Sequence, residues 1–184
     1  QTSTRSPQQI IALSVHSNSS GWDAPQYAPS RCIDGVDGSG TNGCVTLPSV
    51  PSGWIVFDMQ AWHQVTQVEM FGDYSPGRVC GSVAAAVLAT PEVPPRDAVL
   101  DVDAASCSTA TYHQFALSPP REGRYVFVWG CACQSVAYGG ACQFPCVERS
   151  DITGMQIVEV RVLGTPAAMP TAAATTAATA AATT

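Results

Sequence analysis

The chain has 184 residues, of which 46% are hydrophobic, and its formal net charge at pH 7 is −6. This length suffices for one ordinary hydrophobic core. The eight basic residues are all arginine and lie scattered along the chain, so the basic stripe typical of nucleic-acid-binding proteins is absent. We therefore expect no nucleic-acid partner. Because no hydrophobic run approaches the ~20 residues that span a bilayer, we also expect no membrane span.

Eight cysteines in a small acidic chain rich in Gly and Pro indicate an oxidising compartment. We therefore expect a secreted, extracellular protein with up to four disulfides, rather than a cytosolic protein with free thiols. The expected disulfide cysteines are Cys32, Cys44, Cys80, Cys107, Cys131, Cys133, Cys142 and Cys146. Spacing alone does not fix the connectivity, because eight cysteines allow 105 pairings. A start at Gln1 with no secretory signal suits a processed N-terminus.

The first fifty residues combine one short strand with a long loop. Residues 1–9 are a polar lead-in, and residues 10–15 are expected to form the first strand. Asn18 begins an N-glycosylation sequon, which is either modified on the surface of a secreted glycoprotein or left as an unmodified turn. From residue 21 to 51 turn-forming residues dominate, and two cysteines, Cys32 and Cys44, are expected to pin this loop.

Residues 53–78 predict a strand, a turn and a second strand. Residues 54–58 form a buried strand, residues 61–63 a short turn, and residues 65–71 a strand that alternates between apolar and polar side chains. The polar loop 72–78 closes what we interpret as a hairpin-like unit.

The remaining strands are expected at residues 82–90, 98–102, 111–117, 124–129 and 155–163. Each is bounded by turn signals, and no convincing amphipathic helix appears. The predicted fold class is therefore all-β, an antiparallel β-sandwich or jelly roll with long disulfide-pinned loops.

Two segments lie outside this strand pattern. Cys131, Cys133, Cys142 and Cys146 could bind zinc, but their Cys-x-Cys start is atypical of zinc knuckles, so disulfides are the better interpretation. Residues 165–184 are rich in Ala and Thr and contain little to bury, which suits an O-glycosylated tail or linker. The expected organisation is a lead-in at 1–9, one domain at 10–164 and a tail at 165–184.

The order of these motifs resembles the coagulation factor 5/8 C-terminal (discoidin) domains, and among them the fucose-binding F-type lectins. The residues that carry the resemblance are the segment from Ile10, Cys32-Ile33-Asp34-Gly35, the stretch 53–78, the strand 123–129 and the strand 155–164. The resemblance implies a galactose-binding-like sandwich that binds glycans or cell-surface glycoproteins.

The fucose motif of that family is only partly present. The lectins use a His, then 24 residues, then Arg-x-Asp-x4-Arg. Asp73 and Arg78 fall in register with the Asp and the final Arg, while Thr46 stands at the His position and Phe71 at the first Arg position. The resemblance makes these four residues the ligand-binding candidates. Asp73 and Arg78 could equally form a salt bridge that closes the loop.

The family also implies a structural calcium ion. Asp34, Asp37 and Glu159 would supply hard oxygen ligands, supplemented by backbone carbonyls to reach six to eight. The other interpretations are that Asp34-Gly35 and Asp37-Gly38 are plain turns and that Glu159 faces solvent.

Two functions remain open. The first is a carbohydrate or cell-surface binding module with roles in adhesion. The second is a structural subunit of an extracellular assembly, such as a wall, sheath or surface filament, which would contact copies of itself or other subunits. An enzyme is not expected, because His16, His63 and His113 lie in unrelated contexts without a nucleophile motif.

Overall fold

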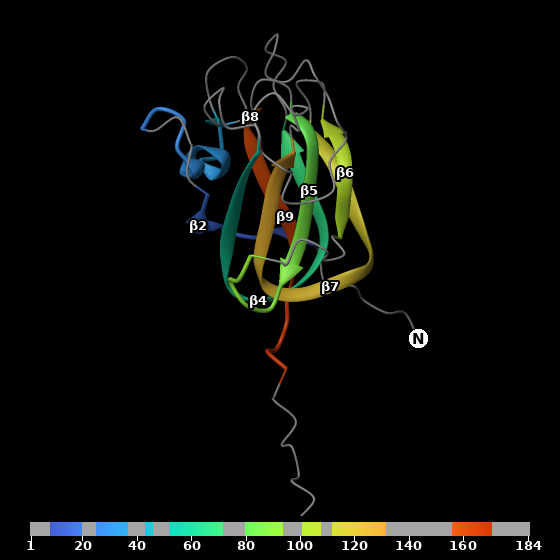
Figure 1. Cartoon of the computed structure of the whole chain (residues 1–184). Coiled ribbons are helices and arrows are strands. Elements are labelled where there is room, and N and C mark those ends of the chain that lie inside the picture. The colour runs from blue at the N-terminus through green and yellow to red at the C-terminus, as the bar shows by residue number, and fades with distance from the viewer. Residues whose placement is uncertain are drawn as a thin grey trace, which may run out of the picture.

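The computed structural model describes residues 8–19, 25–36, 43–45, 52–71, 80–93, 101–107, 112–131 and 156–170. The prediction of an all-β, antiparallel fold is confirmed within these ranges (Figure 1). The strands are β1 (Gln9–Ile10), β2 (Ser14–Asn18), β3 (Cys44–Val45), β4 (Ser52–Phe71), β5 (Cys80–Leu88), β6 (Val102–Cys107), β7 (Tyr112–Cys131), β8 (Gln156–Ile157) and β9 (Glu159–Pro166). The described residues also form a short 3-10 helix, η1 (Pro29–Ile33), and include no helix with the length and hydrophobicity of a membrane span.

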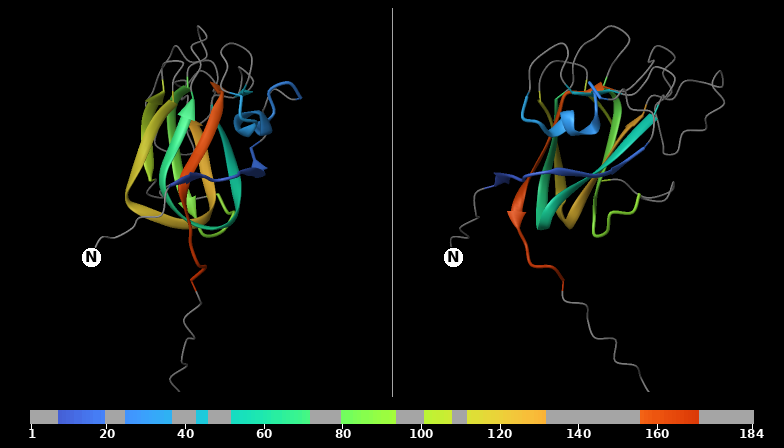
Figure 2. Two further views of the ribbon diagram at one scale, coloured as in Figure 1. Left: turned by 180° about the vertical axis from the view of Figure 1, so that it is seen from behind. Right: turned by 90° about the vertical axis from the view of Figure 1, so that its left-hand side faces the viewer.

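Strands β4 and β7 form one long antiparallel ribbon that belongs to both layers of the sandwich. Ser52 pairs with Cys131 at one extreme of this ribbon, and Phe71 pairs with Tyr112 at the other. The register breaks between Asp58 and His63, where the ribbon bends. The first half of β4 pairs with β2 and the second half with β9, so each half lies in a different layer (Figure 2).

The predicted hairpin within residues 53–78 is wrong. Its two strands are one continuous strand, and each half pairs with β7 instead of with the other half. The predicted strands at 111–117 and 124–129 are likewise parts of β7. The physical reason is that residues 59–62 lack the Asn-Gly or Asp-Gly pair that a tight hairpin turn needs. The chain bends at Gln60, whose φ is 64°, without reversing.

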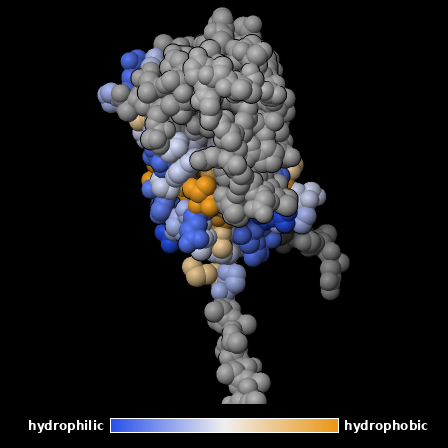
Figure 3. Space-filling model, viewed as in Figure 1, coloured by the Kyte–Doolittle hydropathy of each residue, from blue (hydrophilic) through white to orange (hydrophobic). Residues whose placement is uncertain are grey.

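The core lies between the two layers. It contains the inward-facing side chains of β4, β7 and β9, which are Ile55, Phe57, Met59, Val65, Val68, Met70, Leu117, Val126, Val128, Val160 and Val162. The opposite face of the β4, β5 and β7 region is also buried, around Val56, Ala86, Phe127 and Trp129. In the described surface the exposed large hydrophobics are Ile10, Val36 and Met169, and the visible described surface is mainly hydrophilic (Figure 3).

The strand ends define the two ends of the sandwich. At one end, called here the loop end, β4 finishes at Phe71, β5 begins at Cys80, β6 finishes at Cys107 and β7 begins at Tyr112. At the other end, called here the bend end, His63 lies opposite both Gly123 and Pro166. Strand β1 pairs with β9, which brings Gln9 opposite Gly164.

Candidate functional site

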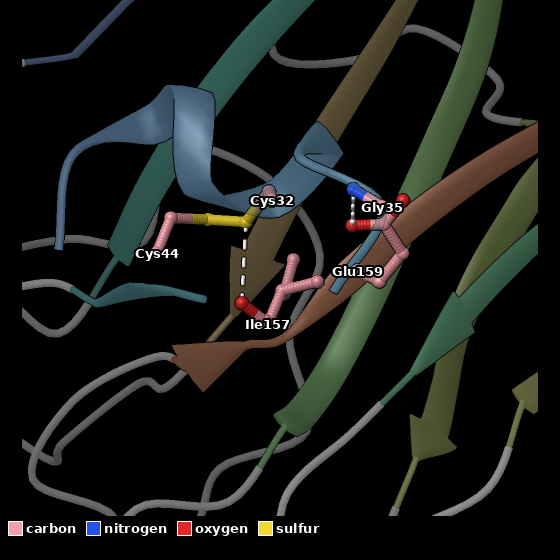
Figure 4. The surroundings of a disulfide bond; sticks show 5 residues. All are labelled: Cys32, Gly35, Cys44, Ile157 and Glu159. Atoms are coloured by element: carbon pink, nitrogen blue, oxygen red, sulfur yellow. Dashed lines mark hydrogen bonds between the residues drawn. A yellow bond between two sulfur atoms is a disulfide. The ribbon is translucent and has the colours of Figure 1, made fainter. Parts of the chain in front are cut away.

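A disulfide joins η1 to β3, which pairs with β8, near the loop end (Figure 4). Cys32 and Cys44 are bonded, with Cα atoms 5.2 Å apart, and both side chains are fully buried. The predicted pinning of the 21–51 loop by these two cysteines is therefore confirmed. The Cys32 Sγ atom packs 3.2 Å from the carbonyl oxygen of Ile157. Gly43 precedes Cys44 with a φ of 113°, a conformation that favours glycine.

The segment that leaves η1 meets a buried carboxylate. The backbone N–H of Gly35 donates to Oε2 of Glu159 at 3.3 Å, and Glu159 is 4% exposed. Asp34 already has two partners, because Oδ1 accepts from the N–H of Val36 at 3.0 Å and Oδ2 pairs with Arg31 at 3.4 Å. The structure thus brings two of the three predicted calcium ligands, Asp34 and Glu159, into one corner.

This corner does not by itself complete a calcium site. Both carboxylate oxygens of Asp34 accept from protein donors, and the guanidinium of Arg31 already offsets its charge. Among the described residues, no group of three or more His, Cys, Asp or Glu is arranged to hold a metal ion. The third predicted ligand, Asp37, lies outside the described residues.

A cavity of about 450 Å³ opens beside the same corner, between η1, the N-terminal segment and β9. Apolar side chains form part of its wall and charged side chains form the rest. Its lining includes Ile10, Ile33, Asp34, Glu159 and Arg161. A volume of this size is in the range of small-molecule sites.

Arg161 connects the cavity with an aromatic pair at the loop end. Its Cζ atom lies 4.0 Å from the centroid of the Tyr112 ring, within cation–π range. Tyr112 meets the ring of Phe71 edge-on, with centroids 5.1 Å apart. Phe71, a predicted ligand position, is 8% exposed, so Tyr112 and Arg161 are the more accessible members of this group. The other predicted ligand residues, Thr46, Asp73 and Arg78, lie outside the described residues.

No motif in the sequence singles out Tyr112 or Arg161 as a binding residue. A signal for Arg161 is present, because Val160 and Val162 alternate around it and leave it on the outer face of β9. Nothing in the sequence pairs Arg161 with Tyr112, which is 49 positions away in the chain. The two residues come together because their strands, β9 and β7, both pair with β4.

A second charged group lies away from the cavity and is structural. Arg124 donates to both carboxylate oxygens of Asp58, from Nε and Nη2, at 2.9 Å each. These hydrogen bonds hold the pKa of Asp58 below its ordinary value, while partial burial acts in the opposite direction. His16 contacts the ring of Tyr125 edge-on beside this pair. The group fixes the strands where the ribbon bends.

The histidines stay apart in the described structure. His16 is exposed on β2, His63 places Nδ1 2.9 Å from the carbonyl oxygen of Ala61, and His113 is opposite Met70.

Asn18, the predicted glycosylation site, is exposed, and its side-chain amide donates to the carbonyl of Ser19 at 2.7 Å.

Comparison with known proteins identifies the fold. The sequence matches no protein-family model, and a sequence search of curated proteins finds no match. Solved structures with similar architecture include an F-lectin (fucolectin) from striped bass (Morone saxatilis) serum, with a TM-score of 0.61 and 14% identity over 84% of this chain. The matched region spans 46% of that lectin chain.

Two carbohydrate-binding modules are similar over nearly their whole length. The family 32 module of C. perfringens NanJ, solved with galactose, has a TM-score of 0.58 and 12% identity, covering 85% of this chain and 99% of that one. Chitosan-binding module 1 of a Paenibacillus sp. IK-5 chitosanase/glucanase has a TM-score of 0.56 and 16% identity, covering 84% of this chain and 98% of that one. The expected resemblance to the discoidin-like, galactose-binding-like fold is confirmed at the level of the fold.

Proposed function

We propose that this protein is a secreted carbohydrate-binding module that acts without catalysis. The observation that carries the proposal is the position of Arg161, which lines the cavity beside Glu159 and stacks on Tyr112 at the loop end. The similar architecture of lectins and carbohydrate-binding modules supports it, although a shared fold alone does not assign function.

The chemistry of this corner suits a sugar. A sugar ring presents hydroxyl groups around its edge and a C–H surface on its faces. Arg161 provides a charge-assisted donor for the hydroxyls, whereas Ile10 and Ile33 provide apolar wall for a ring face. A site with a few polar groups in a largely apolar concavity is typical of small-ligand binding.

Thr46, Asp73 and Arg78 remain the sequence-derived part of the proposed site. Arg78 would donate to hydroxyl groups, and Asp73 would accept from them or hold Arg78 in place. Because two of the three fucose-contacting groups of the resembling lectins are replaced by Thr46 and Phe71, we propose a glycan other than fucose as the preferred ligand.

Calcium belongs to the proposal as a structural ion. Asp34, Asp37 and Glu159 would supply its carboxylate ligands, and the ion would fix the loop after η1. Asp34 would first have to release Arg31, so we expect the ion to add little stability to the natural protein.

The test is a glycan array probed with the full, disulfide-intact chain, with calcium and again with EDTA. The array should include fucose, galactose and chitosan oligomers. Arg161→Gln is expected to weaken binding at least about tenfold, because a hydrogen bond to a charged group contributes ~1.5–3 kcal/mol. Arg121→Gln is the matched control, since Arg121 is half exposed on β7 and pairs with Asp101 away from the cavity.

A blank array in both conditions would remove the lectin-like proposal. The alternative, a structural subunit of an extracellular assembly, would then be tested by sedimentation of the native protein. A binding module is expected to sediment as a small species, whereas a subunit of a wall, sheath or filament would sediment as a polymer. Binding that Arg161→Gln and Arg121→Gln leave equally strong would place the sugar elsewhere on the molecule.

A further inference from the structure

Two cysteines oppose each other at the loop end. Cys80 begins β5 and Cys107 ends β6, and the antiparallel register makes them direct partners. Residues directly opposite in an antiparallel pair lie on the same face of the sheet, with Cα atoms about 4.5–5.5 Å apart. Disulfides join residues whose Cα atoms are about 4.4–6.8 Å apart. The backbone therefore places these two residues at a spacing that a disulfide can span.

The neighbouring strand contains a competing cysteine, Cys131 at the end of β7. Its partner on β5 is Ser82, so it is diagonal to Cys80 and not directly opposite. Diagonal neighbours in a sheet are about 7–8 Å apart, beyond the usual disulfide range. The register thus favours Cys107 over Cys131 as the partner of Cys80.

We propose that Cys80 and Cys107 form a cross-strand disulfide that closes the loop end between β5 and β6. The two thiols lose two protons and two electrons as the S–S bond forms, and a disulfide oxidant of the extracellular compartment accepts them and is reduced to two thiols. With Cys32 bonded to Cys44, this leaves four cysteines, all within residues 131–146. Four cysteines allow three connectivities instead of the 105 open to the whole chain.

The bond has a consequence for the proposed glycan site. Arg78 is two residues before Cys80, and the segment with Asp73 joins Phe71 to β5. A disulfide at Cys80 would fix the start of β5, and an anchored start of this strand lowers the entropic cost of binding a ligand beside it. This effect rests on the proposed function, whereas the disulfide itself does not.

Digestion with trypsin distinguishes the possible disulfide partners of Cys80 and Cys107. Cleavage after arginine gives the peptides 79–96, with Cys80, and 97–121, with Cys107. Cys32 and Cys44 share the peptide 32–78, and the other four cysteines share the peptide 125–149. Mass spectrometry of the unreduced full chain should therefore find 79–96 linked to 97–121 as its one link between peptides. A link between 79–96 and 125–149, or alkylated Cys80 or Cys107, would overturn the proposal.

A double variant gives a second, independent readout. Cys80→Ser/Cys107→Ser should contain no free thiols when alkylated under denaturing conditions, because the remaining cysteines keep their partners. Two alkylated thiols would show that the partners lie elsewhere and would overturn the proposal. The variant is expected to melt about 5–15 °C lower, as is typical for loss of a native disulfide. A blank glycan array with the linked peptides present would reject the proposed function and leave the disulfide intact.

Discussion

The ion pair between Asp58 and Arg124 gives the most direct test of what holds the bent ribbon together. Replacing Arg124 with Met keeps much of the side-chain length but removes both hydrogen bonds to Asp58. The Asp58 carboxylate, whose side chain is only 16% exposed, would keep the backbone N–H of Gln60 at 2.7 Å as a partner. Losing a hydrogen bond to a charged group costs ~1.5–3 kcal/mol in general.

The expected cost here is at the lower end of that range. The side chain of Arg124 is 38% exposed, so solvent screens the charge and water replaces part of the interaction. We expect Arg124→Met to lower the melting temperature by roughly 2–8 °C for a chain of this size. Thermal unfolding followed by circular dichroism measures this shift.

The pH dependence sharpens the test. Because Arg124 lowers the pKa of Asp58 in the folded state, the stabilisation is fully present above the ordinary pKa of about 4 and is lost as the pH falls through the lower folded value. The natural protein and Arg124→Met should therefore differ at pH 7 and converge as the pH drops below about 4. A difference that is the same at pH 7 and pH 3, or absent at pH 7, would refute this reasoning.

Three further substitutions test other contacts. Gly164→Ala would push a methyl group into the carbonyl oxygen of Gln64 across β4 and β9, and should cost more than about 2 kcal/mol in urea unfolding; a loss below about 0.5 kcal/mol would contradict the pairing. Gly43 has a φ of 113° and lies close to the carbonyl oxygen of Ile157, so Gly43→Ala should destabilise the protein by at least ~1–3 kcal/mol. An unchanged melting temperature would contradict the position of β3. Arg31→Gln frees Asp34 from its ion pair and should increase the rise in melting temperature on adding calcium. Natural protein that already melts far lower in EDTA would argue against the weak site proposed here.

The sequence predicted the strands well where periodicity is local. Val68 and Met70 point into the core as the alternation requires, and residues 82–90 correspond closely to β5. The same alternation placed Glu69 on the opposite face, which is correct, yet this side chain is 7% exposed and accepts from Gln67 at 2.7 Å. Alternation assigns a residue to a face, but it does not show whether that face is covered.

The connections between strands were harder to predict because they depend on distant partners. Continuity of β4 through residues 59–62 requires β7 alongside it, and Asp58 finds Arg124 66 residues later. The short helix η1 was missed, since five residues that begin with proline carry no helical periodicity. At the candidate site, the family resemblance predicted Asp34 and Glu159. Tyr112 and Arg161 were not predicted, because only the pairing of β7 and β9 with β4 brings these two residues together.

The pairing of β1 with β9 has a practical consequence for anyone who attaches this domain to something else. Because Gln9 lies opposite Gly164, the chain enters and leaves the fold side by side, and Pro166 lies next to the bend end opposite His63 (Figure 2). A sensor surface, a bead or a neighbouring domain coupled through either terminus would therefore hold the module by its base. The loop end, where β4 finishes at Phe71 and β7 begins at Tyr112, would then face away from the support. Attachment through residues 165–170 is the better choice for a glycan assay, because Ile10, next to Gln9, lines the proposed cavity.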